Sequence, residues 1–253
     1  MSLEALIFDV DGTLADTEET HRQAFNQAFC AFGLDWSWTP QRYRRLLRVT
    51  GGKERIASHL ESLLLESEEQ ARLRQLIPEI HAAKTRYYKL RVGLGRVRPR
   101  AGVRRLLNEA RAAGVRLAIA STTSPENIEA LLSATFGSEA LSWFEAIVTG
   151  DVVARKKPAP DVYLQALAAL GLHAAQAIAL EDSAIGVQAA KGAGLFALAT
   201  PSSWTRYEDF SGADLVLPSL AAPDLDTAHP SRFGAGYVGL AYLAGVHAAF
   251  CMP

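Results

Sequence analysis

Short apolar runs alternate with helical patterns along most of this 253-residue chain. The apolar runs predict buried strands at 4–10, 115–120, 146–149, 177–180, 195–199 and 215–217. The helical patterns between them lie at 103–113, 125–134, 160–170 and 184–193. Strands that alternate with helices of this length favour right-handed βαβ units. The sequence therefore predicts an α/β fold with an open parallel-sheet, Rossmann-like core.

One stretch breaks this alternation and carries only helical signals, at 20–32, 42–48, 53–65 and 68–90. An all-helical insert after the first strand indicates a cap domain, with hinges at Leu14–Asp16 and in the Gly- and Pro-punctuated segment 92–102. Asp16 is expected to cap the first insert helix, with Glu19 completing a capping box. We therefore predict a catalytic core of residues 1–15 and 92–218, a helical cap domain of residues 16–91, and a C-terminal tail of open role at 219–253.

The end of the chain has an unusual composition. Residues 233–253 carry no formally charged side chain apart from titratable His247. Their number approaches the roughly 20 residues that span a bilayer, but four glycines and His247 disfavour that interpretation. We expect an apolar helix or loop packed on the core or on a second subunit, ahead of a frayed tail and a membrane anchor. The formal GxGxxG at 234–239 lacks the following βαβ unit and acidic residue of a dinucleotide site, so we reject it.

Composition excludes several classes of protein. The formal net charge is −1, which argues against a general nucleic-acid binder. Two cysteines, Cys30 and Cys251, cannot build a disulfide framework, and the N-terminal residues lack the features of a secretion signal. We expect a cytoplasmic protein that is a monomer, or a dimer formed through the apolar tail.

Two carboxylates, Asp9 and Asp11, follow the first predicted strand, where open α/β sheets place their ligands. One can act as a nucleophile while the other handles a proton and helps to hold a cation. Gly12 permits a sharp turn and Thr13 offers a hydroxyl. Alone, this motif could equally be a solvated Asp-Gly turn.

Three further strand or loop ends carry suitable chemistry. Ser121 follows the second strand and precedes a helix, which suits anion binding, although a plain helix cap is a common use of such a serine. Lys157 before Pro158 supplies a cation, and by itself would be surface charge. Glu181 and Asp182 end a later strand with hard oxygen ligands that suit Mg²⁺.

These four motifs in this order resemble those of the haloacid dehalogenase superfamily, over residues 1 to about 218. The resemblance implies that Asp9 is the nucleophile of an aspartyl-phosphate and that Asp11 is the general acid and base. Ser121 and Lys157 would hold the phosphoryl oxygens. Mg²⁺ would be bound by the Asp9 carboxylate, the Asp11 carbonyl and Asp182, with Glu181 facing its waters.

The insert places the chain among the helical-cap members, whose caps select the substrate. The glycines of Gly51–Arg55 let backbone N–H groups approach a ligand, and Lys53 and Arg55 flank Glu54 there, so we favour a second phosphate cradle. We interpret the nearby Arg42, Arg44 and Arg45 as a solvated helix face. Two helical i, i+3 pairs are weaker candidates, and they comprise Glu18 with His21 and His81 with Lys84.

Residues 21–26, 50–56, 80–85, 179–183 and 189–194 resemble the CbbY group of sugar-bisphosphate phosphatases, which remove the Rubisco inhibitor xylulose-1,5-bisphosphate. The resemblance implies substrate contacts from the cap and from the 121–127 turn. The predicted substrate-binding residues are Thr13, Glu18, His21, Gly51, Gly52, Lys53, Glu54, Arg55, His81, Lys84, Ser121, Thr122, Thr123 and Lys157. The alternatives are a β-phosphoglucomutase, which Thr13 disfavours, a phosphoglycolate phosphatase, which leaves the cap cations underused, and a non-catalytic sugar-phosphate sensor.

Overall fold

A six-stranded parallel sheet forms the centre of the protein in a computed structural model that describes residues 2–221 and 238–250. The strand order is β3-β2-β1-β4-β5-β6. Their bounds are β1 Ala5–Phe8, β2 Arg116–Ala120, β3 Ala146–Val148, β4 Ala177–Glu181, β5 Phe196–Ala199 and β6 Leu215–Val216. The first five lie within the predicted apolar runs or one residue beyond, because strands buried on both faces are apolar throughout. The α/β prediction is confirmed.

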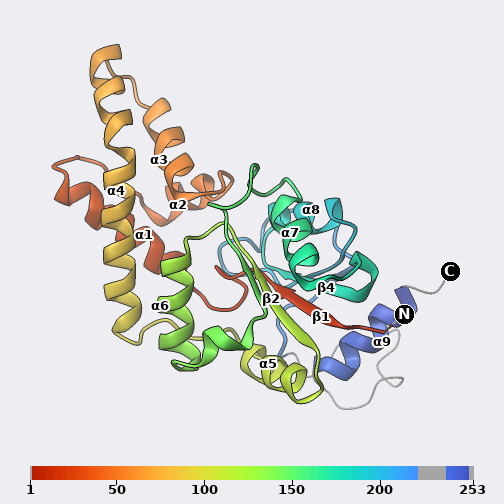
Figure 1. Cartoon of the computed structure of the whole chain (residues 1–253). Coiled ribbons are helices and arrows are strands. Elements are labelled where there is room, and N and C mark those ends of the chain that lie inside the picture. Colours follow the sequence, from red (N-terminus) through yellow and green to blue (C-terminus); the bar gives the residue numbers. More distant parts are fainter. Residues whose placement is uncertain (1, 222–237, 251–253) are drawn as a thin grey trace.

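Helices cover both faces of the sheet (Figure 1). They are α5 Val103–Ala112, α6 Pro125–Phe136, α7 Asp161–Leu170 and α8 Ala184–Gly192, with short 3₁₀ turns at Ala140–Trp143 and Ala174–Gln176. One hydrophobic cluster joins the sheet to α5 and α6, and a second joins the other face to α7 and α8. The carboxyl ends of the central strands therefore meet at one edge that the helices leave open.

The inserted segment forms four helices beside the sheet (Figure 1). They are α1 Glu18–Ala31, α2 Pro40–Leu46, α3 Gly52–Glu61 and α4 Ser67–Gly93. Phe25, Phe29 and Trp38 are the fully buried centre of a third hydrophobic cluster that belongs to these helices. The far end of α4 buries Tyr88 and Val92 in the core cluster instead, so the predicted break after residue 91 falls inside a helix. The two domain boundaries stay a prediction.

Arg100 joins the two segments that connect the cap helices to the core, since it lies in the segment between α4 and α5 and contacts the segment between β1 and α1. Its guanidinium donates to the carbonyls of Gly12 at 2.7 Å and Pro201 at 3.0 Å, and also to that of Thr200. Asp16 lies 3.7 Å from the same side chain and is exposed. The predicted capping box at Asp16 is wrong, because Thr17 occupies the N-cap position without a side-chain cap and Glu19 bonds to Arg22 instead.

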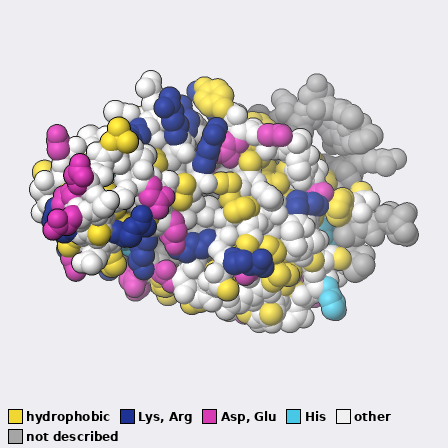
Figure 2. All heavy atoms as spheres, turned by 90° about the horizontal axis from the view of Figure 1, so that it is seen from above, with side chains coloured by type: hydrophobic (Ala, Val, Ile, Leu, Met, Phe, Trp, Pro, Cys, Tyr) yellow, Lys and Arg dark blue, Asp and Glu magenta, His cyan; other side chains and the backbone are white. Residues whose placement is uncertain are grey.

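The apolar tail contains α9, Leu240–Phe250, which packs on the core as predicted. Leu243 and His247 are buried, and the Phe250 ring meets Phe196 edge-on at 5.1 Å. Most of the rejected GxGxxG lies outside the described residues, as does Cys251. Among the residues described, no helix is long and apolar enough to cross a membrane. On the face shown in Figure 2, basic side chains are interspersed with acidic and uncharged ones.

Candidate active site

The open edge of the sheet gathers the predicted core motifs. Asp9, Ser121 and Asp182 each directly follow a strand, and these three strands, β1, β2 and β4, are neighbours in the sheet. Gly12 makes this approach possible, since it has φ +88° and a Cβ there would lie 2.2 Å from Asp182 Oδ2. The parallel register therefore brings together residues that are more than a hundred positions apart in the sequence.

Lys157 reaches this group from the loop between β3 and α7. Its Nζ lies 2.7 Å from Asp9 Oδ1 and 2.6 Å from Glu181 Oε1, and all three side chains are buried. Burial lowers the pKa of Lys157, but the two neighbouring carboxylates together raise it by a larger amount. The net shift is therefore upward, and the ammonium stays charged. Tyr163 also donates to Glu181 Oε1 at 2.6 Å. Glu181 therefore anchors Lys157.

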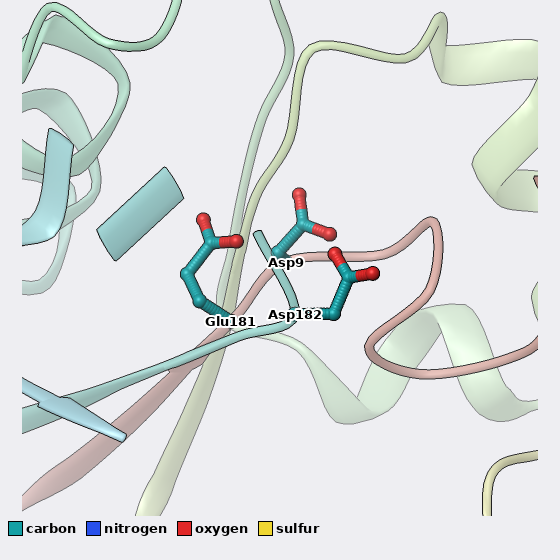
Figure 3. A group of neighbouring side chains, drawn as sticks. All are labelled: Asp9, Glu181 and Asp182. Carbon is teal, nitrogen blue, oxygen red and sulfur yellow. The ribbon is translucent and has the colours of Figure 1, made fainter. Parts of the chain in front are cut away.

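Asp9, Glu181 and Asp182 present oxygens that all lie within 4.8 Å of one another (Figure 3). Burial raises the pKa of Asp9 to about 7 despite the opposing effect of Lys157. Burial and the neighbouring Asp9 also raise the pKa of Asp182 well above its usual range. The three buried carboxyl groups share one positively charged lysine, so their negative charges outnumber the positive charge when they are ionised. Their hard oxygen atoms suit a divalent cation that would balance this charge. The residues present fit the predicted Mg²⁺ site.

Asp11 is held from the cap side. Its Oδ1 accepts hydrogen bonds from Thr17 Oγ1 at 2.6 Å and from His21 Nε2 at 2.8 Å. Lys84 Nζ lies 2.8 Å from His21 Nδ1, so a charged Lys84 donates to Nδ1 and His21 keeps its proton on Nε2. Burial would raise the pKa of Asp11, but His21 and Thr17 outweigh it and lower that pKa well below its usual range.

Burial lowers the pKa values of both cap-side bases, His21 and Lys84. It lowers the pKa of His21, which keeps the ring neutral, and lowers the pKa of Lys84 to about 8. The His21 ring also stacks on Tyr88 with centroids 4.1 Å apart. Lys84, His21 and Asp11 therefore form a chain of hydrogen bonds that runs from α4 to the catalytic loop.

Most of the predicted site residues line one cavity between the sheet edge and α1 to α4. The predicted residues that line it are Asp9, Asp11, Glu18, His21, Gly51, Gly52, Lys53, Arg55, His81, Lys84, Ser121, Thr122, Thr123, Lys157 and Asp182. Thr13 does not, because its side chain is buried below the turn, with no hydrogen-bond partner among the described residues. Glu54 is turned away to pair with Lys156, and Glu181 lies beneath Lys157.

The cap wall depends on its two glycines. Gly51 has φ +91°, and a Cβ there would lie 2.1 Å from Glu54 Oε2; a Cβ on Gly52 would lie 2.4 Å from His81 Nε2. Lys53 is exposed at the rim of the cavity. Arg55 is less available than predicted, because its Nε donates to backbone carbonyls of Leu46 and Val49.

Several lining residues were not predicted individually, although Ser124 and Asn127 belong to the 121–127 turn for which substrate contacts were expected. Lys156 is next to Lys157 in the sequence, lines the same cavity and lies 2.6 Å from Glu54, and the doubled lysine was the signal for it. Ser124 and Asn127, at the start of α6, also line the cavity, and the buried Ser124 Oγ and Asn127 Oδ1 have no hydrogen-bond partner among the described residues. Such atoms suit the hydroxyls of a polar ligand.

Comparisons with known proteins agree with this geometry. A sequence model of the haloacid dehalogenase-like hydrolase family matches residues 3–194. The protein CbbY of Rhodobacter capsulatus is 52% identical over 88% of this chain and 96% of its own length. The CbbY protein of Cupriavidus necator is 48% identical over 87% of each chain.

Solved structures give the same result. One match is the crystal structure of Rhodobacter sphaeroides CbbY, as an Asp-to-Asn mutant in complex with xylulose-1,5-bisphosphate. Its sequence is 47% identical to this one, and the two structures match with a TM-score of 0.79 over 86% of this chain and 94% of that one. A Clostridium difficile β-phosphoglucomutase matches at 22% identity and a TM-score of 0.68, over 86% and 91% of the two chains, which shows a shared fold. The chain belongs to the haloacid dehalogenase-like hydrolase family and is a phosphatase.

Proposed function

We propose that the protein is a Mg²⁺-dependent phosphatase of small sugar bisphosphates, with xylulose-1,5-bisphosphate as its substrate, and that it works in the cytoplasm through an aspartyl-phosphate. The observation that carries this proposal is the single cavity in which Asp9 and Lys157 face the cap residues Lys53 and His81. The likeness to a CbbY protein crystallised with that bisphosphate supports the choice of sugar.

The first step uses Asp9 and Lys157. A carboxylate attacks the phosphorus in line, while Lys157 and Ser121 hold the phosphoryl oxygens. Lys157 already contacts Asp9 at 2.7 Å, so it reduces the repulsion between the nucleophile and an incoming phosphate. Mg²⁺ held by Asp9, Asp182 and the Asp11 carbonyl would neutralise the remaining negative charge and keep Asp9 ionised.

Asp11 moves the protons. Oδ1 already accepts two hydrogen bonds, so Oδ2 is the oxygen that serves the substrate. An incoming phosphate raises the pKa of Asp11 by charge repulsion, so Asp11 takes up a proton from solvent and donates it to the leaving sugar oxygen as the bond from phosphorus to that oxygen breaks. The resulting carboxylate, stabilised by His21, takes a proton from the water that hydrolyses the aspartyl-phosphate.

The second phosphate explains the cations that this chemistry leaves unused. Lys53 and Lys156, the distal cations, line the cavity together with the backbone N–H groups after Gly51, and Lys156 contacts Glu54 of the cap. Ser124 and Asn127, which line the same cavity, offer hydrogen-bond partners for sugar hydroxyls. A monophosphate such as phosphoglycolate would leave the distal cations without an anion.

The proposal is tested by phosphate release with Mg²⁺ from four substrates: xylulose-1,5-bisphosphate, ribulose-1,5-bisphosphate, glucose-1,6-bisphosphate and phosphoglycolate. We expect kcat/KM to favour the xylulose compound by about a hundredfold, which corresponds to roughly 3 kcal/mol of transition-state binding. Equal and slow rates would reject the substrate while leaving the phosphatase chemistry intact. Conversion of β-glucose-1-phosphate that requires a bisphosphate activator would identify a mutase instead.

A further inference from the structure

One loop of the core contacts both the cap and a carboxylate of the proposed metal site. This loop comprises residues 201–210 and follows β5. None of its residues was a sequence-based candidate, and no step of the mechanism above uses it.

Its cap contact is aromatic. Trp204 packs against the hydrophobic cluster of the cap helices, and the Tyr43 ring meets it edge-on with centroids 5.6 Å apart. The Arg44 guanidinium lies 5.7 Å from the Trp204 ring centroid and 5.6 Å from that of Tyr207. Both distances are within the range of a cation–π contact. Arg44 is exposed, as expected for a solvated helix face, and it makes these two ring contacts in addition.

Its contact with the metal site is a hydroxyl. Thr205 Oγ1 donates to the backbone carbonyl of Asp182 at 2.6 Å and lies 3.2 Å from Asp182 Oδ2. The same oxygen accepts from the backbone N–H of Ser202 at 2.9 Å. Both Thr205 and Asp182 are buried. The Ser202 N–H fixes this hydroxyl, and its one proton is shared between the Asp182 carbonyl and, more weakly, the Asp182 carboxylate, so Thr205 restrains both groups.

The two contacts are made by consecutive residues in one tight turn. The Trp204 N–H lies 3.3 Å from Ser202 Oγ, and the Thr205 N–H lies 3.3 Å from the Ser202 carbonyl. One planar peptide unit joins the two residues, so a displacement of the backbone at Trp204 is passed on to Thr205.

We propose that Trp204 and Thr205 are positioning residues for the phosphatase reaction. Thr205 orients Asp182 toward the cation, and Trp204 docks α2 of the cap on the core. Docking of the cap and affinity for Mg²⁺ are coupled through this turn. The proposal rests on the proposed function for its metal, but its first test measures binding of Mg²⁺ alone.

The first test compares Thr205→Val with Thr205→Ser by calorimetric titration with Mg²⁺, without substrate. We expect Val to weaken Mg²⁺ binding about tenfold, the lower end of the effect of residues that orient metal ligands, and Ser to restore it within about twofold. Thr135→Val is the matched control, because Thr135 is buried and bonds to the Leu131 carbonyl in α6. Circular dichroism verifies folding, and Thr205→Ala replaces Val if Val disturbs packing.

The second test addresses the coupling. Trp204→Ala should weaken Mg²⁺ binding about threefold and raise KM for the bisphosphate, whereas Trp204→Phe should keep both near wild type. Trp143→Ala is the control, since Trp143 is also half-buried and stacks on an arginine, Arg111, at 4.2 Å. Unchanged Mg²⁺ affinity in Thr205→Val, or in Trp204→Ala, would overturn the proposal. If the wild type binds Mg²⁺ but hydrolyses none of the bisphosphates, the proposed function fails while the titrations still decide this inference.

Discussion

The two walls of the cavity are built in different ways. On the core wall, Asp9, Ser121 and Asp182 each directly follow a strand, so the hydrogen-bonded sheet fixes their positions. On the cap wall, Gly52 and His81 lie on helices α3 and α4. Side chains on and beside α3 contact the core: Glu54 lies 2.6 Å from Lys156, and the Thr50 hydroxyl donates to the Lys157 carbonyl at 2.5 Å.

This difference assigns the chemical step to the core wall and the selection of substrate to the cap wall. Bond making needs geometry held within about half an ångström, which a sheet edge supplies. Substrate entry needs a wall that opens, and contacts between exposed or half-buried side chains break at low cost. Changes in the core wall should therefore reduce kcat, and changes in the outer cap wall should raise KM.

The largest effect is expected from Asp9→Asn. We expect kcat to fall by about 10⁴-fold or more, the scale on which loss of a nucleophile acts. The melting temperature should not fall, because the change removes one of three buried acids and leaves Lys157 paired with Glu181. Phosphate release and a thermal melt measure the two. Activity within tenfold of wild type, in protein shown by mass spectrometry to retain Asn, would refute the role of Asp9.

Lys84→Met tests the limit of this division, since Lys84 belongs to the cap but should affect kcat through its contact with the core. It removes the cation that fixes the proton of His21 on Nε2, so Asp11 loses a donor. We expect kcat to fall by about a hundredfold with KM changed by less than threefold, as for a displaced general acid and base. A change confined to KM would show that Lys84 only binds substrate.

The same lysine predicts an alkaline limit to activity. Burial lowers the pKa of Lys84 to about 8, so kcat should decline above that pH as the ammonium loses its proton. The sign for stability is opposite: between about pH 8 and the ordinary lysine pKa near 10.4, the unfolded chain binds more protons, and this group stabilises the fold as pH rises. Lys84→Arg should move the limit upward. An unchanged pH profile in Lys84→Arg would assign the limit to another group.

The sequence predicted the core wall much better than the cap wall. A residue that follows a parallel strand is placed by the strand itself, so the sequence located Asp9, Ser121 and Asp182 at the open edge of the sheet, and the family resemblance supplied their predicted roles. The contact of Lys156 with Glu54 joins residues more than a hundred positions apart, and no periodicity records it. The predicted cap at Asp16 failed for a related reason, since Asp16 lies beside Arg100, and Thr13 is buried in the turn instead of lining the cavity.

The smallest effect is expected on the outer cap wall, and Lys53→Met measures it. Lys53 is exposed at the rim, so its removal should raise KM for the bisphosphate about tenfold, leave kcat within twofold, and leave a sugar monophosphate unaffected. Arg45→Met is the matched control, because Arg45 is an exposed cation of the same cap that does not line the cavity. Equal effects of the two variants would mean that the cap attracts phosphates by its overall charge. An effect confined to Lys53 and weakened by salt would assign the distal phosphate to this rim, because screening acts on exposed charges.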